Sequence, residues 1–286
     1  MSQAKNGYVN ALTIDVEDYF HVGNFSPYIK VEQWDNLEEV APQATYRILR
    51  LLEEHGVRAT FFTLGWLAKR HPRLVRAIHA SGHEVACHGY FHEPLTKLHP
   101  DEFRADIRAA KRLLEDTVGT SVRGFRAPSF SINESNLWTF DVLIEEGFEY
   151  DSSLYPGRLV PFGFAGAFRH PHNVDRGSGG LIKELPMATL KMFGVKLPFA
   201  GGGHFRLYPY WMIRRGIRRI NENERAPVIV YFHPWEIVPS QPRIKASLRA
   251  SIKHYLGLGA MEYKITHLLR DFNFVPAAEL LEHFRL

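Results

Sequence analysis

The sequence predicts an α/β fold, a distorted (β/α) barrel of about seven parallel strands in a single domain over residues 1–286. Short apolar runs alternate with amphipathic helical segments, as expected when helices connect parallel strands on the outside of a sheet. Four polar motifs come directly after apolar runs, at residues 15–18, 88–92, 126 and 233. Because the carboxyl ends of barrel strands meet at one face, these distant motifs are predicted to lie together there.

The first half of the chain is predicted to alternate strands with helices. The strands are Tyr8–Ile14, Val57–Leu64, Glu84–Cys87 and Val122–Phe125. The helices are Pro42–His55, Leu67–Ser81, Asp101–Val118 and Glu134–Glu146, and each is followed by a glycine that can end it.

The second half of the chain is less regular. Residues 157–180 are rich in Gly, Phe, Pro and His without a period, which predicts an irregular loop, and Gly201–His204 is predicted to be a flexible turn. Predicted strands are a short one at Tyr150, then Leu181–Leu185, Ala188–Met192, Val228–Phe232 and Phe274–Val275. Predicted helices are Tyr208–Asn221, Ile244–Tyr255, Met261–Arg270 and a last one from Ala277.

The composition is that of an ordinary globular protein, with 45% hydrophobic and 23% charged residues. The formal charge of +4 is mildly basic, and basic residues are scattered except for the cluster Arg214–Arg219. We expect this cluster to form a solvated helix face; a weaker alternative is contact with an anionic glycan or lipid headgroup. Nothing else suggests a nucleic acid as partner.

Cysteine content and apolar segments predict the cellular context. Cys87 is the only cysteine, so no internal disulfide can form. The N-terminal residues lack the apolar core of a signal peptide, and no run of about 18 apolar residues could span a membrane. We therefore expect a cytoplasmic protein without a transmembrane segment, and peripheral contact with a membrane stays an open alternative.

Two histidines, His88 and His92, stand four residues apart after the predicted strand 84–87. Imidazole is the commonest metal ligand in proteins, and two at this spacing can bind one ion. Gly89 and Pro94 disfavour a helix, so we expect a loop at the strand end. The alternative is a pair of solvated histidines in a chain that contains 15.

Three carboxylates, Asp15, Glu17 and Asp18, follow the first predicted strand. They would repel one another unless a cation or a basic partner compensates their charge. The alternative is an acidic loop in water. Apolar residues on both sides, Ile14 and Tyr19, favour a functional site at the end of a core strand.

Two histidines and a carboxylate form a common catalytic zinc set that leaves one position open for water. A metal lowers the pKa of that water and polarises a carbonyl oxygen. A second carboxylate can then accept a proton, and a histidine such as His233 can protonate a leaving group. Arg126 can pair with the basic carboxylate, with a structural salt bridge as the alternative. His233 alone could equally be a core histidine, and Cys87 is expected to pack in the core.

Four motifs in this order resemble the polysaccharide deacetylases of carbohydrate esterase family 4. They are Asp15-Val16-Glu17-Asp18, His88-Gly89-Tyr90-Phe91-His92, Arg126-Ala127-Pro128 and Phe232-His233-Pro234, and the similarity covers roughly residues 8–285. Three segments, Asp15–Phe20, Gly201–Arg206 and His233–Glu236, further resemble the subgroup found at bacterial exopolysaccharide and exosortase loci, which implies a subgroup-specific part over about residues 200–286. The resemblance implies a distorted barrel, a divalent metal and removal of acetyl groups from N-acetylated sugars. The implied metal is Zn²⁺, with Co²⁺, Ni²⁺, Mn²⁺ or Fe²⁺ as alternatives.

The resemblance also implies residue roles. By position, Asp15 is the catalytic base, His88 and His92 bind the metal, Arg126 tethers the base and His233 is the general acid. Substrate contacts are expected from four further residues, Phe91, Pro128, Tyr155 and Trp235.

The first motif departs from the usual family form of two adjacent aspartates, because Val16 follows Asp15. A branch of the family with an acid two positions further on maps the metal carboxylate to Glu17, which shares a strand face with Asp15. Asp18 is the alternate metal carboxylate if the strand end contains a bulge.

We therefore expect a metal-dependent hydrolase that removes N-acetyl groups from amino sugars of a bacterial polysaccharide or its precursor. One rival keeps the fold and the metal but acts on a small amide, imide or ureide. A second rival is a catalytically silent barrel that binds glycans. Asp15 and His233 argue against the silent barrel, because binding alone needs neither.

Overall fold

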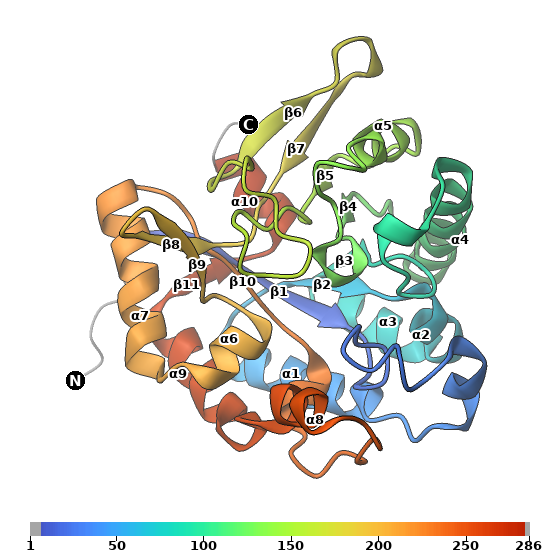
Figure 1. The fold of residues 1–286 in the computed structure, drawn as a ribbon, viewed down its shortest axis with the longest axis horizontal. Helices are drawn as coiled ribbons and strands as arrows, with labels where there is room; N and C mark the ends of the chain where they lie inside the picture. Colours follow the sequence, from blue (N-terminus) through green and yellow to red (C-terminus); the bar gives the residue numbers. More distant parts are fainter. Residues whose placement is uncertain (1–6, 284–286) are drawn as a thin grey trace.

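Nine strands form one curled sheet with helices around it in the computed structural model, which describes residues 7–283 (Figure 1). Seven neighbouring strands run parallel in the order β10-β1-β2-β3-β4-β5-β7. At the edges, β11 pairs parallel with β1, and β6 pairs antiparallel with β7. The bounds are β1 Val9–Val16, β2 Thr60–Thr63, β3 Glu84–Cys87, β4 Gly124–Phe125, β5 Tyr150–Asp151, β6 His172–Asp175, β7 Leu181–Glu184, β10 Ile229–Phe232 and β11 Asn273–Val275.

The predicted α/β architecture with about seven parallel strands is confirmed. The sheet is a curled half-barrel, because within residues 7–283 no ladder of paired strands joins β6 or β7 back to β10. The free edge of β10 instead meets the chain at Gly201 through one bridge to Tyr231, whose N–H donates to the Ala200 carbonyl at 3.1 Å. The open side of the barrel is therefore covered by irregular chain.

Most of the helices pack outside the curled sheet (Figure 1). Their bounds are α1 Ala41–Glu54, α2 Gly65–Arg70, α3 Pro72–Ala80, α4 Pro100–Val118, α5 Trp138–Glu145, α6 Gly202–Leu207, α7 Tyr210–Arg219, α8 Leu248–Tyr255, α9 Met261–Asp271 and α10 Ala277–His283. The single helix predicted over Leu67–Ser81 is wrong, since the chain breaks at His71. Proline has no N–H to donate and disfavours helical geometry in the residue before it, so Pro72 starts a new helix.

Two apolar clusters hold the fold. The larger lies between the sheet and the outer helices and includes Ile14, Cys87 and Phe125, which agrees with the core packing predicted for Cys87. The smaller lies inside the barrel, where Phe62, Ala86 and other inward-facing residues contact Leu280 and Leu281 of α10. Helix α10 thus packs against the interior of the barrel. This arrangement leaves the carboxyl ends of the strands as the open end.

Three elements in the second half differ from expectation. The loop predicted over 157–180 contains β6, and the turn predicted at Gly201–His204 is the start of α6. The strand predicted over Ala188–Met192 is confirmed as β8, Thr189–Met192, but the sequence did not indicate β9, Val195–Pro198, with which β8 forms a hairpin. Neither β6 nor β9 has a long apolar run, because both are short and lie partly exposed.

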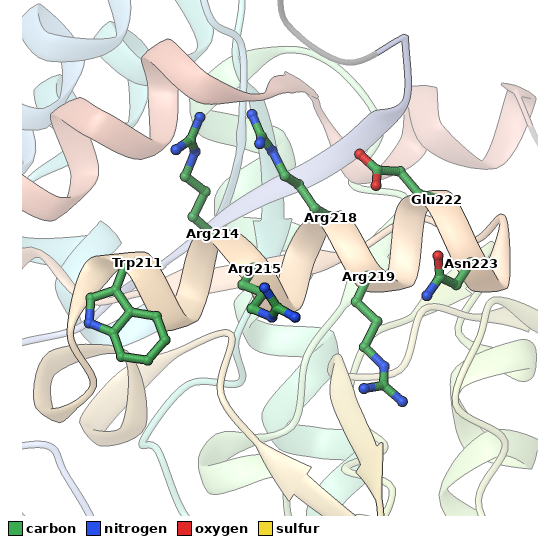
Figure 2. A pocket seen from close by; sticks show the side chains of 7 residues that line it. All are labelled: Trp211, Arg214, Arg215, Arg218, Arg219, Glu222 and Asn223. Carbon is green, nitrogen blue, oxygen red and sulfur yellow. The ribbon is translucent and has the colours of Figure 1, made fainter.

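The arginine cluster predicted at residues 214–219 lies on α7. Figure 2 shows Arg214 and Arg218 projecting to one side of the helix and Arg215 and Arg219 to the other. Arg215 and Arg219 are exposed, as expected, whereas Arg214 is half-buried and pairs with Asp271 at 2.8 Å. Within residues 7–283, no helix is long and apolar enough to cross a membrane.

Candidate metal centre and active site

The carboxyl ends of four strands bring the predicted motifs together. Asp15 is the penultimate residue of β1, and Glu17 follows that strand. His88 follows β3, Arg126 follows β4 and His233 follows β10. Asp15, Glu17, His88 and His233 line one cavity of about 540 Å³, as the barrel geometry predicts.

Glu17, His88 and His92 form a buried group whose ligand atoms all lie within 4.8 Å of one another. Glu17 Oε2 is 2.5 Å from His92 Nε2 and 3.8 Å from His88 Nε2. Among the described residues, this is the group of histidine, cysteine and acidic side chains arranged to hold a metal ion.

The loop between His88 and His92 is held by its neighbours. The Asp106 carboxylate of α4 accepts the Tyr90 N–H at 2.8 Å and the Phe91 N–H at 3.4 Å. The Gly65 N–H donates to the Gly89 carbonyl at 2.8 Å. Gly89 has φ +73°, a left-handed conformation that glycine adopts without strain and that turns the chain back toward the cavity. The loop predicted at this strand end is therefore present, with both imidazoles facing Glu17.

The donor set fits a divalent cation. His88 Nδ1 lies 2.8 Å from the Arg126 carbonyl, so the ring donates there and directs Nε2 toward Glu17. Burial lowers the pKa of His88 to about 4, which keeps its nitrogen lone pair free at neutral pH. Burial alone would raise the pKa of Glu17, but His92 and His233 hold it well below its usual range. A carboxylate beside two imidazoles is the nitrogen and oxygen set that Zn²⁺ and similar ions accept.

Arg126 pairs with Asp15, as predicted. Its Nη1 donates to Asp15 Oδ1 at 2.7 Å and also to the Thr13 hydroxyl at 2.7 Å. The other side of the guanidinium donates to the Ser152 carbonyl at 3.0 Å and the Ser152 hydroxyl at 2.8 Å. The guanidinium also lies 4.1 Å from the ring centroid of Phe62. Since Arg126 is fully buried and held on every side, it fixes the orientation of Asp15.

His233 faces both acids across the cavity. Its Nε2 lies 3.4 Å from Glu17 Oε1 and 3.9 Å from Asp15 Oδ2. Its ring atom Nδ1 lies 3.5 Å from Glu236 Oε2, and the backbone N–H of His233 donates to the same oxygen at 3.1 Å. Burial lowers the pKa of His233, but Glu17, Glu236 and Asp15 together raise it to about 9. The imidazole is thus held between a carboxylate behind it and the cavity in front.

Asp18 lies apart from this group. Its Oδ1 accepts the Tyr19 N–H at 2.9 Å, and its Oδ2 accepts the Val40 and Ala41 N–H groups at 2.9 and 2.8 Å. These contacts stabilise the start of α1, where N–H groups have no partner within the helix. Asp18 is not among the cavity residues, so the structure gives it a structural setting and favours Glu17 of the two alternatives.

Two of the four predicted substrate contacts line the cavity. Tyr155 and Trp235 face it. Phe91 and Pro128 do not line it: Phe91 is 45% exposed beside the loop, and Pro128 is buried behind Gly89. Strand alternation could not place either residue, because both lie in irregular turns.

Glu236 and Arg206 are site residues that the sequence did not indicate by role. Arg206 Nε lies 3.4 Å from Glu236 Oε1, and both side chains are buried at the cavity wall. Trp235 stacks between His233 and His254, with ring centroids 5.2 and 4.3 Å away. Glu236 could have been found from its position three residues after His233, because a single turn brings its side chain back to the His233 ring. Arg206 is far from Glu236 in sequence and gave no such signal.

Two sequence families match successive parts of the chain. Residues 33–141 match the family described as polysaccharide deacetylase, and residues 152–282 match a domain of unknown function, DUF3473. A peptidoglycan-N-acetylglucosamine deacetylase from Bacillus cereus is 37% identical over 135 residues, which is 41% of this chain and 49% of the relative. The chain thus spans about half or less of the length of the first curated relatives it matches.

Solved structures share the fold, among them the following two. A Mycobacterium smegmatis protein assigned to the polysaccharide deacetylases aligns over 100% of this chain and 94% of its own, with a TM-score of 0.63 and 22% identity. PuuE allantoinase aligns over 96% of this chain and 89% of its own, with a TM-score of 0.62 and 17% identity. At this identity the likeness concerns the fold alone.

Proposed function

Since residues 33–141 match the polysaccharide deacetylase family, we propose that this protein is a metal-dependent hydrolase of N-acetyl amides on the amino sugars of a polysaccharide or oligosaccharide. The observation that carries the proposal is the placement of a metal-binding triad, a tethered carboxylate and a histidine around one cavity. Metal-dependent amide hydrolysis uses each of these parts, whereas glycan binding needs none of them.

Glu17, His88 and His92 would hold the cation. When bound, a divalent cation supplies Lewis-acid polarisation of a carbonyl oxygen and makes water more acidic. We favour Zn²⁺, because two imidazoles and a carboxylate with room for water are a common catalytic zinc set. Co²⁺, Ni²⁺, Mn²⁺ and Fe²⁺ accept the same donors.

Asp15 accepts a proton from the attacking water as the new carbon–oxygen bond forms. Arg126 keeps the Asp15 carboxylate oriented through the 2.7 Å contact, and it leaves Oδ2 on the side of His233. His233 then donates a proton to the amide nitrogen as the carbon–nitrogen bond breaks, since an unprotonated amine is a poor leaving group. The products are acetate and a free amino sugar.

Glu236 is a positioning residue in this scheme. Its carboxylate lies behind His233 Nδ1, so it favours the orientation in which Nε2 faces the cavity. Arg206 holds Glu236 from the other side. Glu236 therefore fixes the ring that delivers the proton.

An N-acetylated sugar is the substrate class that this proposal implies. Tyr155 and Trp235 line the cavity beside the proposed acid. The Bacillus cereus relative carries N-acetylglucosamine of peptidoglycan in its name. The association with exopolysaccharide loci and a subgroup-specific part from about residue 200 remain predictions, as the second family match begins earlier, at residue 152.

Acetate release from N-acetylglucosamine oligomers tests the proposal. We expect release by the metal-loaded protein, loss on chelation and recovery on metal addition. Allantoin and small amides assayed in parallel test the rival that keeps the fold and the metal. Hydrolysis of these compounds without acetate release from the oligomers would favour that rival, and oligomer binding without turnover of any compound would favour the silent barrel.

A further inference from the structure

One segment of the chain carries a single sign of charge. Residues 237–261 contain four basic residues and no acidic one, and we call them the basic segment. The basic residues are Arg243, Lys245, Arg249 and Lys253. Lys245, Arg249 and Lys253 are exposed. A local excess of this kind attracts anionic partners.

Helix α8, within this segment, presents an apolar row to solvent. Ala250 and His254 face inward and are buried. Leu248, Ile252 and Leu256 are 76%, 52% and 54% exposed, and their spacing of four places them along one side. Arg249 and Lys253 each follow one of these apolar residues, so a basic row runs beside the apolar one.

Helix α8 also borders the candidate active site. Lys253 and His254 line the same cavity as Glu17 and His233. The Asn24 side chain, also at the cavity, donates to the Ala250 carbonyl at 2.8 Å and fixes α8 there. Tyr28, 43% exposed, hydrogen-bonds Ser247 at the start of the helix and adds an aromatic ring to the same region.

We propose that this face of α8 docks on an anionic phospholipid membrane. Leu248, Ile252 and Leu256 enter the boundary between headgroups and acyl chains, and Lys245 and Arg249 contact lipid phosphates. An apolar row flanked by basic residues is the pattern of an interfacial helix, and an amphipathic aromatic such as Tyr28 suits the same depth. Because Lys253 and His254 of the same helix line the cavity, the candidate active site then lies beside the membrane.

The charge of the basic segment favours an anionic membrane over a second copy of the chain. A second copy of the same face would bring like charges together, because the basic segment has no acid to offset them. Aliphatic side chains also lack the flat aromatic surface on which sugar rings stack, so a glycan is a poorer match. The arginines of α7 form another basic surface (Figure 2), but acids lie beside them: Glu222 lines the same pocket and Asp271 pairs with Arg214.

Vesicle co-sedimentation without substrate tests the proposal, so its outcome is independent of the proposed deacetylation. We expect binding to phosphatidylglycerol–phosphatidylcholine vesicles, weak binding to phosphatidylcholine alone, and loss of binding at high salt. Lys245→Gln with Arg249→Gln should weaken binding about fivefold for each residue. Leu248→Gln with Ile252→Gln should weaken it by roughly tenfold or more, as buried apolar area is lost.

The matched control replaces exposed arginines on another helix, Arg215→Gln with Arg219→Gln, and should leave vesicle binding unchanged. All three double variants change exposed side chains, and circular dichroism checks that they fold. Equal binding to both vesicle types, no binding to either, or equal loss in the α7 control would overturn the proposal. Self-association of the wild type that the α8 variants abolish, without vesicle binding, would assign the face to a second copy instead.

Discussion

Adjacent acids at the end of β1 have different surroundings. Glu17 faces two imidazoles, whereas Asp18 accepts three backbone N–H groups at the start of α1. The Glu17 carboxyl group therefore serves the cavity, and the Asp18 carboxyl group serves the fold. Mutation of each residue can therefore distinguish the role of Glu17 in the cavity from the role of Asp18 in the fold.

We predict that Glu17→Gln lowers metal affinity by more than the ~10–100-fold typical of losing an outer-shell partner. Asp18→Asn should leave metal affinity nearly unchanged and lower the free energy of unfolding by about 1–3 kcal/mol, because the amide nitrogen that replaces one carboxyl oxygen cannot accept a backbone N–H. Competition with a chromogenic chelator and urea unfolding measure the two effects. A larger loss of metal affinity in Asp18→Asn would move the ligand to Asp18.

A second prediction distinguishes the role of His233 as proton donor from the role of Glu236 in orienting it. His233→Ala should lower kcat by ~10²–10⁴-fold with metal retained, as for loss of a general acid. Glu236→Gln should lower kcat by a smaller factor and leave KM nearly unchanged, because the ring remains but its orientation is less fixed. Exposed Glu222→Gln is the matched control. Unchanged kcat in Glu236→Gln would remove its positioning role.

At the scale of elements, the strands that carry the site were predictable because each combines an apolar run with a polar end. β3 and β10 match the expected strands closely, and β1 extends two residues beyond the expected Ile14, which places Asp15 inside the strand. Strand alternation also favoured Glu17 over Asp18. These local patterns were sufficient to predict that His88 and His233 lie on one face of the barrel.

Other features could not be predicted from the sequence because they depend on tertiary contacts. β6 forms on the edge of β7 with alternating half-buried and exposed residues, so it lacks an apolar run. The contact between Arg206 and Glu236 joins residues 30 positions apart that no period relates. Pro72 indicates a helix break at His71. The prediction of one continuous helix gave more weight to the helical pattern on both sides of it.

We predict that Asp106→Ala weakens metal binding although Asp106 is no ligand. Its carboxylate orders the His88–His92 loop through two backbone N–H groups, so its loss leaves His92 less well placed. Isothermal titration with Zn²⁺ measures the effect. Asp116→Ala, an exposed position on the same helix, should bind like the wild type. Equal affinity in both variants would show that the loop needs no such support.

At the scale of the molecule, buried neutral histidines link stability to pH. The pKa of His83 is lowered to about 4 by burial and by Arg58, from an ordinary value near 6.5. Its Nδ1 accepts the Ala59 N–H at 3.2 Å, which requires an unprotonated ring nitrogen. The unfolded chain thus binds more protons than the folded one between these values, so stability falls as the pH drops from about 6.5 to 4.

We predict that His83→Gln reduces this loss, since glutamine can accept the same N–H and does not titrate. Urea unfolding of metal-free protein at several pH values measures the slope. An unaltered slope in the variant would assign the acid sensitivity to other groups.

The central claim is that one cation held by Glu17, His88 and His92 enables amide hydrolysis by Asp15 and His233. Titration of metal-free protein with Zn²⁺, followed by both bound metal and acetate release from N-acetylglucosamine oligomers, tests it most directly. We expect activity to rise in proportion to bound metal up to one equivalent. His92→Ala should bind little metal, and Asp15→Asn should bind one equivalent with little turnover. Full activity in metal-free wild type, or in His92→Ala without metal, would contradict the claim.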